Sequence, residues 1–430
     1  MMRRLCVGLA AVLALVAPAA ARADWSAPRQ ISAVQPGLET PRLAFDGQGD
    51  VFSAWDQGDA RNLFAAVGSA KPQLLGDDVV LDDVSASRNG SALLVATGRN
   101  RHGGRIETFV RRPGGHFRPS QVLDRIPRPY AYFHHALLGA DPAGDAAVVW
   151  TRARRKHPDS PLLIAARRHG GRFGRTRAVS KAGVTAFAFA MNPTGRFVVA
   201  WVRGTNMEAR VGRGATLGPV RRLGAANSGL PPVVAVAIDG HGNALVAWLG
   251  ASDIELSYHQ AGFGFGAPRA VPHEPGAGFG GHMALAFTTN EHAVLALDGA
   301  SSDGAGIFTF DVFQGAASPA IRLAPPPSGA LGPRLQGVAT GPRGQVAVWW
   351  ATLRAGSGYT GVSDLFASYR DTGTFSAPAQ VSTPNTPLAD TSGFPVSTVR
   401  FDPISGNPVA LWIAAPSGGQ VDAVETSTRR

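Results

Sequence analysis

The chain has 430 residues and a formal net charge of +11, from 41 Lys and Arg against 30 Asp and Glu. Its single cysteine, Cys6, lies in the N-terminal segment described next, so we expect a mature protein without disulfides, thiolate nucleophiles or cysteine-bound metals. The length allows two or three ordinary domains or one large array of repeats.

The first residues have the features of a secretory signal peptide. Arg3 and Arg4 precede the apolar run LCVGLAAVLALVA, and the small-residue stretch ARA ends at Ala23. The apolar run has 13 residues, which is too short for a permanent membrane-spanning helix. We therefore expect residues 1–23 to be cleaved off after Ala23, leaving a protein without a transmembrane anchor that is secreted, periplasmic or on the exterior of the cell envelope.

One short pattern then recurs along the chain: a polar turn that ends in glycine, followed six positions later by tryptophan. It reads DGQGDVFSAW, DPAGDAAVVW, NPTGRFVVAW, DGHGNALVAW, GPRGQVAVWW and DPISGNPVALW, and it ends at Trp55, Trp150, Trp201, Trp248, Trp350 and Trp412. The leading Asp or Asn can cap the turn, and the glycine can adopt a positive φ angle. We expect the tryptophans to anchor the repeat by packing between neighbouring sheets.

The turns lack the spaced carboxylates of a calcium loop, so we expect no metal, and nothing in the chain predicts another cofactor.

Each pattern belongs to a longer unit. An apolar segment such as TAFAFAM precedes it, and a second extended segment and an aromatic-led phrase such as RFGRTRAVS follow it. Four short strands in about 50 residues, without helical periodicity, indicate an all-β fold, a β-propeller. We count eight units, with six or seven as alternatives, in a single domain over residues 24–430: 39–77, 78–126, 127–183, 184–228, 229–278, 279–327, 328–384 and 385–430.

The two ends of the predicted propeller complement each other. Residues 24–32 contain WSAPRQIS, which corresponds to a fourth strand, whereas the last unit ends after its third strand. We therefore expect residues 24–32 to complete the last blade and to close the ring, which leaves few unpaired strand edges.

Two phrases, SYRDTGTFSAPAQVS (368–382) and AARRHGGRFGRTRAVS (165–180), resemble secreted bacterial β-propellers of the sialidase-like, Asp-box class. That family has a Ser-x-Asp-x-Gly-x-Thr-Trp turn between the third and fourth strands. Ser368, Asp371, Gly373 and Phe375 approximate it, with the serine one residue farther away. For an enzyme, the resemblance implies three arginines, a Tyr–Glu pair and an aspartate. Arg125 lies in a DRIP stretch that matches three positions of the family's Phe-Arg-Ile-Pro, but the Tyr–Glu pair cannot be assigned.

Positive charge is concentrated in residues 78–183, which contain 19 Lys and Arg against 8 Asp and Glu, a net +11. In an antiparallel blade, the loop before the first strand and the loop between the second and third strands lie at the same end. In the third unit these loops predict a ligand-binding cluster of Arg125, Arg128, Tyr130, Tyr132, His134, His135, Arg152, Arg154, Arg155, Lys156 and His157. Guanidinium groups bind carboxylate, phosphate or sulfate oxygens, and tyrosines stack on sugar rings. A solvated basic surface without a ligand is the alternative interpretation.

The sequence favours a binding or scaffolding protein and predicts no catalytic residue, although catalysis stays open. We expect an exported monomer whose partner is an anionic glycan, an envelope polymer or a protein. Nucleic acid is not an expected partner, because basic and aromatic residues do not alternate and because the protein is exported. Two alternatives remain: a sialidase-like glycoside hydrolase, which needs an acidic pair in the axial pocket, and a structural protein–protein interaction module.

Overall fold

The computed structural model describes residues 25–33, 38–57, 61–100, 103–127, 132–153, 161–227, 233–251, 253–272, 278–302, 304–324, 330–354, 362–383, 397–414 and 423–429. The predicted signal peptide lies outside these ranges. The regular elements within them are all β-strands, so this part of the chain has no helix that could cross a membrane.

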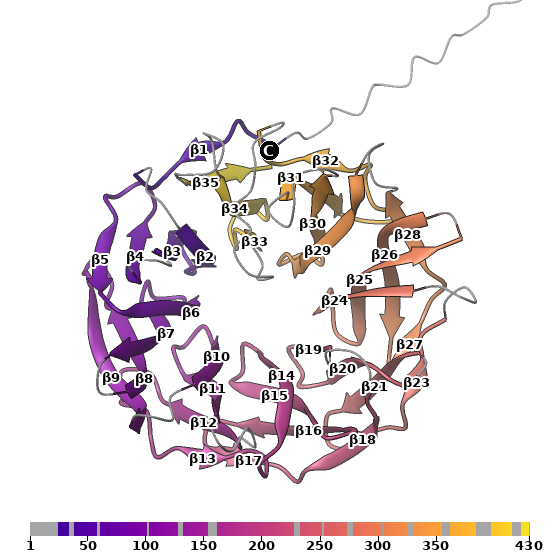
Figure 1. Cartoon of the computed structure of the whole chain (residues 1–430), viewed down its shortest axis with the longest axis horizontal. Coiled ribbons are helices and arrows are strands. Elements are labelled where there is room, and N and C mark those ends of the chain that lie inside the picture. The colour runs from indigo at the N-terminus through magenta and orange to yellow at the C-terminus, as the bar shows by residue number, and fades with distance from the viewer. Residues whose placement is uncertain are drawn as a thin grey trace, which may run out of the picture.

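The strands form eight separate sheets arranged in a ring, which confirms the predicted eight-bladed β-propeller and excludes the alternatives of six or seven blades (Figure 1). Blade 1 contains β2 (Leu38–Phe45), β3 (Val51–Gln57), β4 (Asn62–Val67) and β5 (Gln73–Gly76). Blade 2 contains β6 (Val79–Ala86), β7 (Ala92–Asn100), β8 (Gly103–Arg111) and β9 (Phe117–Pro127). Blade 3 contains β10 (Tyr132–Ala140), β11 (Ala146–Ala153), β12 (Leu162–Arg167) and β13 (Arg177–Ala178).

The next three blades each have a fourth strand in two short pieces. Blade 4 contains β14 (Val184–Met191), β15 (Arg196–Arg203), β16 (Asn206–Arg213), β17 (Thr216–Leu217) and β18 (Arg221–Ala225). Blade 5 contains β19 (Val234–Ile238), β20 (Ala244–Leu249), β21 (Ile254–Gln260), β22 (Gly264–Phe265) and β23 (Arg269–Ala270). Blade 6 contains β24 (Gly278–Phe287), β25 (His292–Ser301), β26 (Gly304–Phe313), β27 (Ala316–Ala317) and β28 (Ile321–Ala324).

The last two blades bring the ends of the chain together. Blade 7 contains β29 (Ala330–Thr340), β30 (Val346–Arg354), β31 (Val362–Arg370) and β32 (Ala379–Gln380), and blade 8 contains β33 (Ser397–Phe401), β34 (Pro408–Ala414) and β35 (Ala423–Thr428). The N-terminal strand β1 (Arg29–Gln30) pairs antiparallel with β35 as the fourth strand of blade 8. The backbone N–H of Ile31 donates to the carbonyl of Val424 at 2.9 Å. The predicted closure of the ring by the N-terminal strand is therefore confirmed.

The first strand of every blade lies nearest the axis of the ring and contacts the first strands of both neighbouring blades (Figure 1). Because each blade is antiparallel, the turns between its first and second strands and between its third and fourth strands lie on one face of the ring. We call this the turn face. We call the opposite face, to which the loops between blades and between second and third strands belong, the loop face.

The repeated turns have the geometry that their sequence predicts. In blade 5, Oδ1 of Asp239 accepts hydrogen bonds from the backbone N–H groups of His241 and Asn243 at 2.9 and 2.8 Å. Gly242 in the same turn has a φ of 92°. In blade 6, which lacks the turn glycine, Glu291 takes the left-handed conformation with a φ of 69°. The leading acids therefore stabilise the turns locally.

The repeat tryptophans lie between blades. Trp150 packs with Val95 and Ile106 of blade 2, and Trp248 packs with Val198 and Met207 of blade 4. In each of the six cases the apolar partners include side chains of the preceding blade, and Trp55 of blade 1 contacts blade 8 in the same way. All six are at most 3% exposed, so the recurring tryptophan fills the seam between consecutive sheets.

Candidate functional site

Much of the predicted ligand-binding cluster lies outside the described residues: this holds for Arg128, Tyr130, Arg154, Arg155, Lys156 and His157. Tyr132, His134 and His135 lie on β10 at the loop face. In the register of that strand pair, Tyr132 is opposite Ala153 and His134 is opposite Thr151 of β11.

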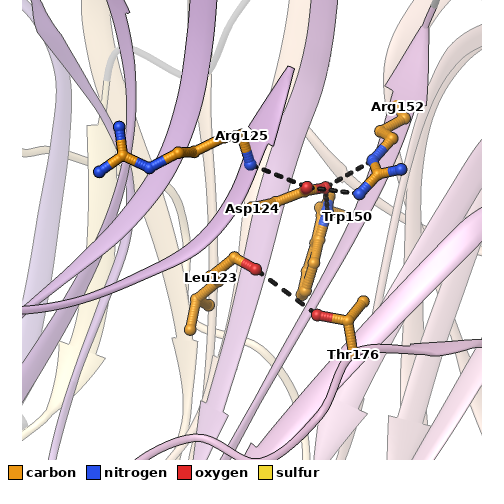
Figure 2. Close-up of polar contacts among 6 residues, drawn as sticks. All are labelled: Leu123, Asp124, Arg125, Trp150, Arg152 and Thr176. Carbon is orange, nitrogen blue, oxygen red and sulfur yellow. Dashed lines mark hydrogen bonds and ion pairs between the residues drawn. The ribbon is translucent and has the colours of Figure 1, made fainter. Parts of the chain in front are cut away.

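Arg152, a member of the predicted cluster, already has an anionic partner in the fold (Figure 2). Its Nε donates to Oδ2 of Asp124 at 2.7 Å, and its Nη2 donates to Oδ1 of the same carboxylate. The indole Nε1 of Trp150 also donates to Oδ2, at 2.9 Å. The hydrogen bonds between Arg152 and Asp124, together with the charge of that carboxylate, raise the pKa of Arg152. A ligand anion would therefore have to compete with a buried carboxylate for this guanidinium.

Arg125 is exposed and follows Asp124 on β9, so the two side chains point to opposite faces of the sheet. Its backbone N–H donates to Oδ1 of Asp124 at 2.9 Å. Figure 2 shows the guanidinium of Arg125 directed away from Arg152. The structure therefore does not bring these two arginines of the predicted cluster together.

A larger concentration of arginines lies on the turn face, between blades 2 and 3. A cleft of about 870 Å³ is lined there by the turns that join β8 to β9 and β12 to β13. Its basic lining residues are Arg112, His116, Arg118, Arg167, His169 and Arg172. No aspartate or glutamate lines this cleft.

A second cleft of about 700 Å³ continues from the first, between blades 3 and 4. The two share Arg167, Gly171 and Arg172, and the second adds Arg168 and Arg213. Together they form one groove across three blades, which we call the basic groove and define by Arg112, His116, Arg118, Arg167, Arg168, His169, Arg172 and Arg213. An open groove of this extent fits an extended polymer better than a small molecule.

The local sequence explains why the basic side chains gather here. The segments RRPGGH (111–116) and RRHGGR (167–172) form equivalent turns in consecutive blades. In the first, the N–H of Gly115 donates to the carbonyl of Arg112 at 3.0 Å, and in the second the N–H of Gly171 donates to the carbonyl of Arg168 at 2.9 Å. The paired glycines contribute no side chain that would fill the cleft. Sequence reasoning missed this site, although the repeated RRxGG pattern was a signal that could have revealed it.

The exposed arginines of the basic groove are not neutralised by the fold. Among the described residues, Arg112, Arg118, Arg168, Arg172 and Arg213 form no ion pair. Elsewhere the arginines that project from strands are often paired, as in Arg105–Glu107, Arg152–Asp124, Arg203–Glu208 and Arg370–Asp311. Asp145 is the one carboxylate among the described lining residues of the two clefts, so positive charges outnumber negative charges there. Like charges gathered in this way repel one another, and a bound anion offsets that repulsion.

Arg167 is the least hydrated of these arginines. Its guanidinium lies 5.5 Å from the centre of the Phe173 ring, and its Nε is buried without a hydrogen-bond partner among the described residues. Burial lowers the pKa of Arg167, and the nearby carboxylate of Asp145 partly opposes this. Arg167 therefore forms the floor of the groove, at the point where the two clefts meet.

A third cavity of about 510 Å³ lies on the axis of the ring, between the first strands of blades 8, 1, 2, 3 and 4. Asp46 and Asp83 are the carboxylates that line it. Asp46 accepts the N–H groups of its own turn, and Asp83 accepts those of Val84 at 2.9 Å and Leu138 at 3.1 Å. Burial raises the pKa of Asp83, and Arg42 and Arg400 oppose this effect. Both carboxylates therefore stabilise the backbone of the axial wall.

The described residues contain no group of three or more His, Cys, Asp or Glu side chains that could hold a metal ion.

No family model matches the chain, and no curated protein is similar to it in sequence. Among solved structures, it is similar to the Dos1 propeller, with 9% identity over 93% of this chain and 94% of that chain and a TM-score of 0.51. Polysaccharide lyase Uly1 is 8% identical over 97% of this chain and 94% of that chain, with a TM-score of 0.49. The Aleuria aurantia lectin is 11% identical over 82% of this chain and 100% of that chain, with a TM-score of 0.41. At such identities the likeness concerns the propeller fold alone.

Proposed function

We propose that the protein is an exported, monomeric β-propeller that binds a linear anionic polymer, such as an acidic glycan of the cell envelope, without chemically changing it. The observation that carries this proposal is the set of unpaired arginines along the basic groove. Guanidinium groups form bidentate, charge-assisted hydrogen bonds with carboxylate and sulfate groups. A polymer with regularly spaced anionic groups would neutralise several of these arginines at once.

The loop-face cluster predicted from the sequence is a competing location for the same function. Arg152 is held there by Asp124, whereas within the described residues the exposed groove arginines form no ion pair. We therefore assign the polymer to the turn face. We favour a binding protein over a hydrolase, because both carboxylates that line the axial cavity accept backbone N–H groups. We favour it over a protein-interaction module, because positive charge is the dominant feature of the groove.

Polymer binding is tested with alginate and heparin as carboxylated and sulfated probes and with dextran as the neutral probe. One variant changes Arg112, Arg118 and Arg172 to Ser, and a matched variant changes Arg154, Arg155 and Lys156 to Ser. Both remove three positive charges. We expect the groove variant to lose about 100-fold or more in affinity for a polyanion, because each charged hydrogen bond contributes about 1.5–3 kcal/mol. We expect the loop-face variant to bind nearly as the native protein does.

Three outcomes would contradict the proposal. Equal binding of dextran and the polyanions would show that charge is not recognised. Loss of binding in the loop-face variant alone would move the site to the loop face. The release of new reducing or unsaturated sugar ends during incubation would show that the protein is an enzyme.

A further inference from the structure

The axial cavity differs from the basic groove in shape and lining. It is a single space on the ring axis, and its volume of about 510 Å³ lies in the range of pockets for small ligands. Five first strands supply an apolar wall that includes Leu138, Met191 and Phe401. Two arginines, Arg88 and Arg400, also line it. An apolar wall with a few polar groups is typical of a site for a small organic molecule.

Within the described residues, the guanidinium groups of Arg88 and Arg400 have N–H groups that donate no hydrogen bond to the protein. Nη1 of Arg400 donates to the carbonyl of Val399 at 3.0 Å, and within the described residues the side chain forms no ion pair. Arg88 is exposed, and its side chain packs against Gly47 of blade 1. A Cβ added to Gly47 would lie 2.3 Å from Cγ of Arg88. In the part of the protein that the structure describes, no ion pair engages Arg88 either.

The lining of the cavity contains groups of both charges. Arg88 and Arg400 carry two positive charges, Asp46 and Asp83 carry two negative charges, and Arg42 lies near Asp83 and Arg400 outside the lining. The carboxylates accept backbone N–H groups, as described above, so they do not neutralise Arg400 by direct contact. Arg400 is partly exposed to solvent; desolvation by the surrounding strands lowers its pKa, and the carboxylate of Asp83 opposes this effect. In such an environment an attraction between opposite charges is stronger than in water.

We propose that the axial cavity is a second binding site, which holds a small monocarboxylate with an apolar body. Arg400 and Arg88 bind the carboxylate group, and the apolar body lies against Leu138, Met191 and Phe401. Because Asp46 and Asp83 also line the cavity, a dianion would meet more repulsion there than the single charge of a carboxylate. Arg88 and Arg400, which bind the carboxylate, do not belong to the basic groove, and Met191 is the residue that lines both the axial cavity and the second cleft of the groove.

Isothermal titration calorimetry with phenylacetate, phenylacetamide and phenyl phosphate tests the inference on the full-length mature chain. The amide has the shape of phenylacetate without its charge, and phenyl phosphate carries the dianionic alternative. We expect phenylacetate to bind at least about tenfold more tightly than either, because one charged hydrogen bond contributes about 1.5–3 kcal/mol. Hexanoate and hexanamide repeat the comparison with an aliphatic body.

Two variants locate the bound carboxylate. Arg400→Gln and Arg88→Gln each remove one charge and keep a polar side chain, and we expect each to weaken phenylacetate binding about tenfold or more. Arg112→Gln in the basic groove is the matched control and should bind phenylacetate as the native protein does. Conversely, Arg400→Gln should still bind alginate, which separates this inference from the proposed polymer site. Because Arg400 lies near Asp83, the exposed Arg88 provides a second test that does not depend on the fold tolerating a change at Arg400.

Four results would overturn the inference. They are no binding of either carboxylate to the native protein, equal binding of phenylacetate and its amide, tighter binding of phenyl phosphate, and unchanged phenylacetate binding in both folded variants.

Discussion

Trp150 and Arg152 are two residues apart on β11, and both donate a hydrogen bond to Oδ2 of Asp124 on β9 of the preceding blade, at 2.9 and 2.7 Å. The same geometry recurs within blade 4. There Trp201 and Arg203 both donate to Oε2 of Glu208, at 2.8 and 3.1 Å. Side chains at positions i and i+2 of a strand point to the same face, so a Trp-x-Arg sequence presents two donors to one carboxylate. In blade 3 this arrangement joins two blades, and in blade 4 it joins neighbouring strands of one blade.

Replacing Asp124 with Asn tests the contact between blades 2 and 3. The carboxylate is 4% exposed, and the change leaves Arg152 without its anionic partner. We expect the free energy of unfolding to fall by about 1–2 kcal/mol, because charge-assisted hydrogen bonds are lost while Arg152, which is 38% exposed, stays partly hydrated. Chemical denaturation measures this, with Asp77→Asn on an exposed aspartate as the control for the change in net charge. A loss in Asp124→Asn no larger than in the control would show that the contact does not stabilise the seam.

Replacing Trp248 with Ala tests the role of the repeat tryptophan. Its side chain is fully buried between blades 4 and 5, so the change removes a large apolar surface and leaves a cavity. We expect a loss of about 3–5 kcal/mol in the free energy of unfolding. The exposed Phe263→Ala change is the comparison, because that side chain is 84% exposed and should contribute little. Similar losses in the two variants would contradict the assignment of Trp248 to the core.

Gly144→Ala tests the link between a repeat turn and the basic groove. Gly144 has a φ of 93°, and a Cβ there would lie 2.2 Å from Nδ1 of His169, which lines the groove. Gly204 is a matched control, because its φ is 59° and no atom lies within 4 Å of the added Cβ. We expect Gly204→Ala to lower the free energy of unfolding by about 1–2 kcal/mol through backbone strain alone. We expect Gly144→Ala to lower it further, because the added Cβ also collides with His169. Thermal unfolding ranks the two variants, and equal costs would show that the His169 ring moves aside freely.

His259 should make the stability depend on pH. The side chain is 8% exposed, its Nδ1 has no hydrogen-bond partner among the residues that the structure describes, and burial lowers its pKa below 6.5. The folded state therefore disfavours the protonated imidazole. The contribution of neutral His259 to the free energy of unfolding is therefore fully present above the pKa of histidine in the unfolded chain, about 6.5. As the pH falls below that value, the contribution decreases by at most about 1.4 kcal/mol per pH unit until the pKa of His259 in the folded state is reached.

The variant His259→Phe keeps an aromatic ring beside Phe265 and removes the titration. We expect its free energy of unfolding to fall less steeply between pH 7 and pH 5 than that of the native protein, in denaturation curves measured at each pH. The exposed His241→Gln change should leave the native slope unaltered. Parallel curves for the native protein and His259→Phe would contradict the buried, neutral state of His259.

Ring closure gives a further prediction. Val424 donates its backbone N–H to Oγ of Ser32 at 2.8 Å, and β1 covers the outer edge of β35. A chain that begins at residue 33 should unfold at a lower temperature than one that begins at residue 24, because the edge of β35 loses its partner strand. The same comparison by light scattering should show more aggregation of the shorter chain. Identical melting temperatures would mean that β1 does not contribute to stability.

The number of blades and the closure of the ring could be predicted because their signals are local. A turn acid, a left-handed glycine and a tryptophan six residues later occupy fixed positions in most units, as Asp239, Gly242 and Trp248 do in blade 5. Blade 6 has Thr288, Glu291 and Leu297 at these three positions and still follows the pattern, because its neighbours leave a gap of one blade and because Glu291 adopts the left-handed turn conformation.

The candidate site was predicted only in part. The excess of charge in residues 78–183 includes most of the basic groove, but the predicted cluster was placed on the loop face. The paired RRxGG segments show that local sequence contained the turn-face alternative as well. What the sequence could not show is that Asp124, 28 residues before Arg152, meets it across a seam between blades.

The sequence by itself therefore determined the repeat, the antiparallel meander of each blade and the strand that closes the ring, because turn conformation and apolar periodicity act within a few residues. Only the tertiary structure decided which charges are neutralised. An ion pair depends on contact within a few ångströms, and the packing of one blade against the next sets those distances. That packing gives Arg152 a carboxylate, and among the residues that the structure describes it leaves Arg112, Arg118 and Arg172 without an ion pair on the turn face.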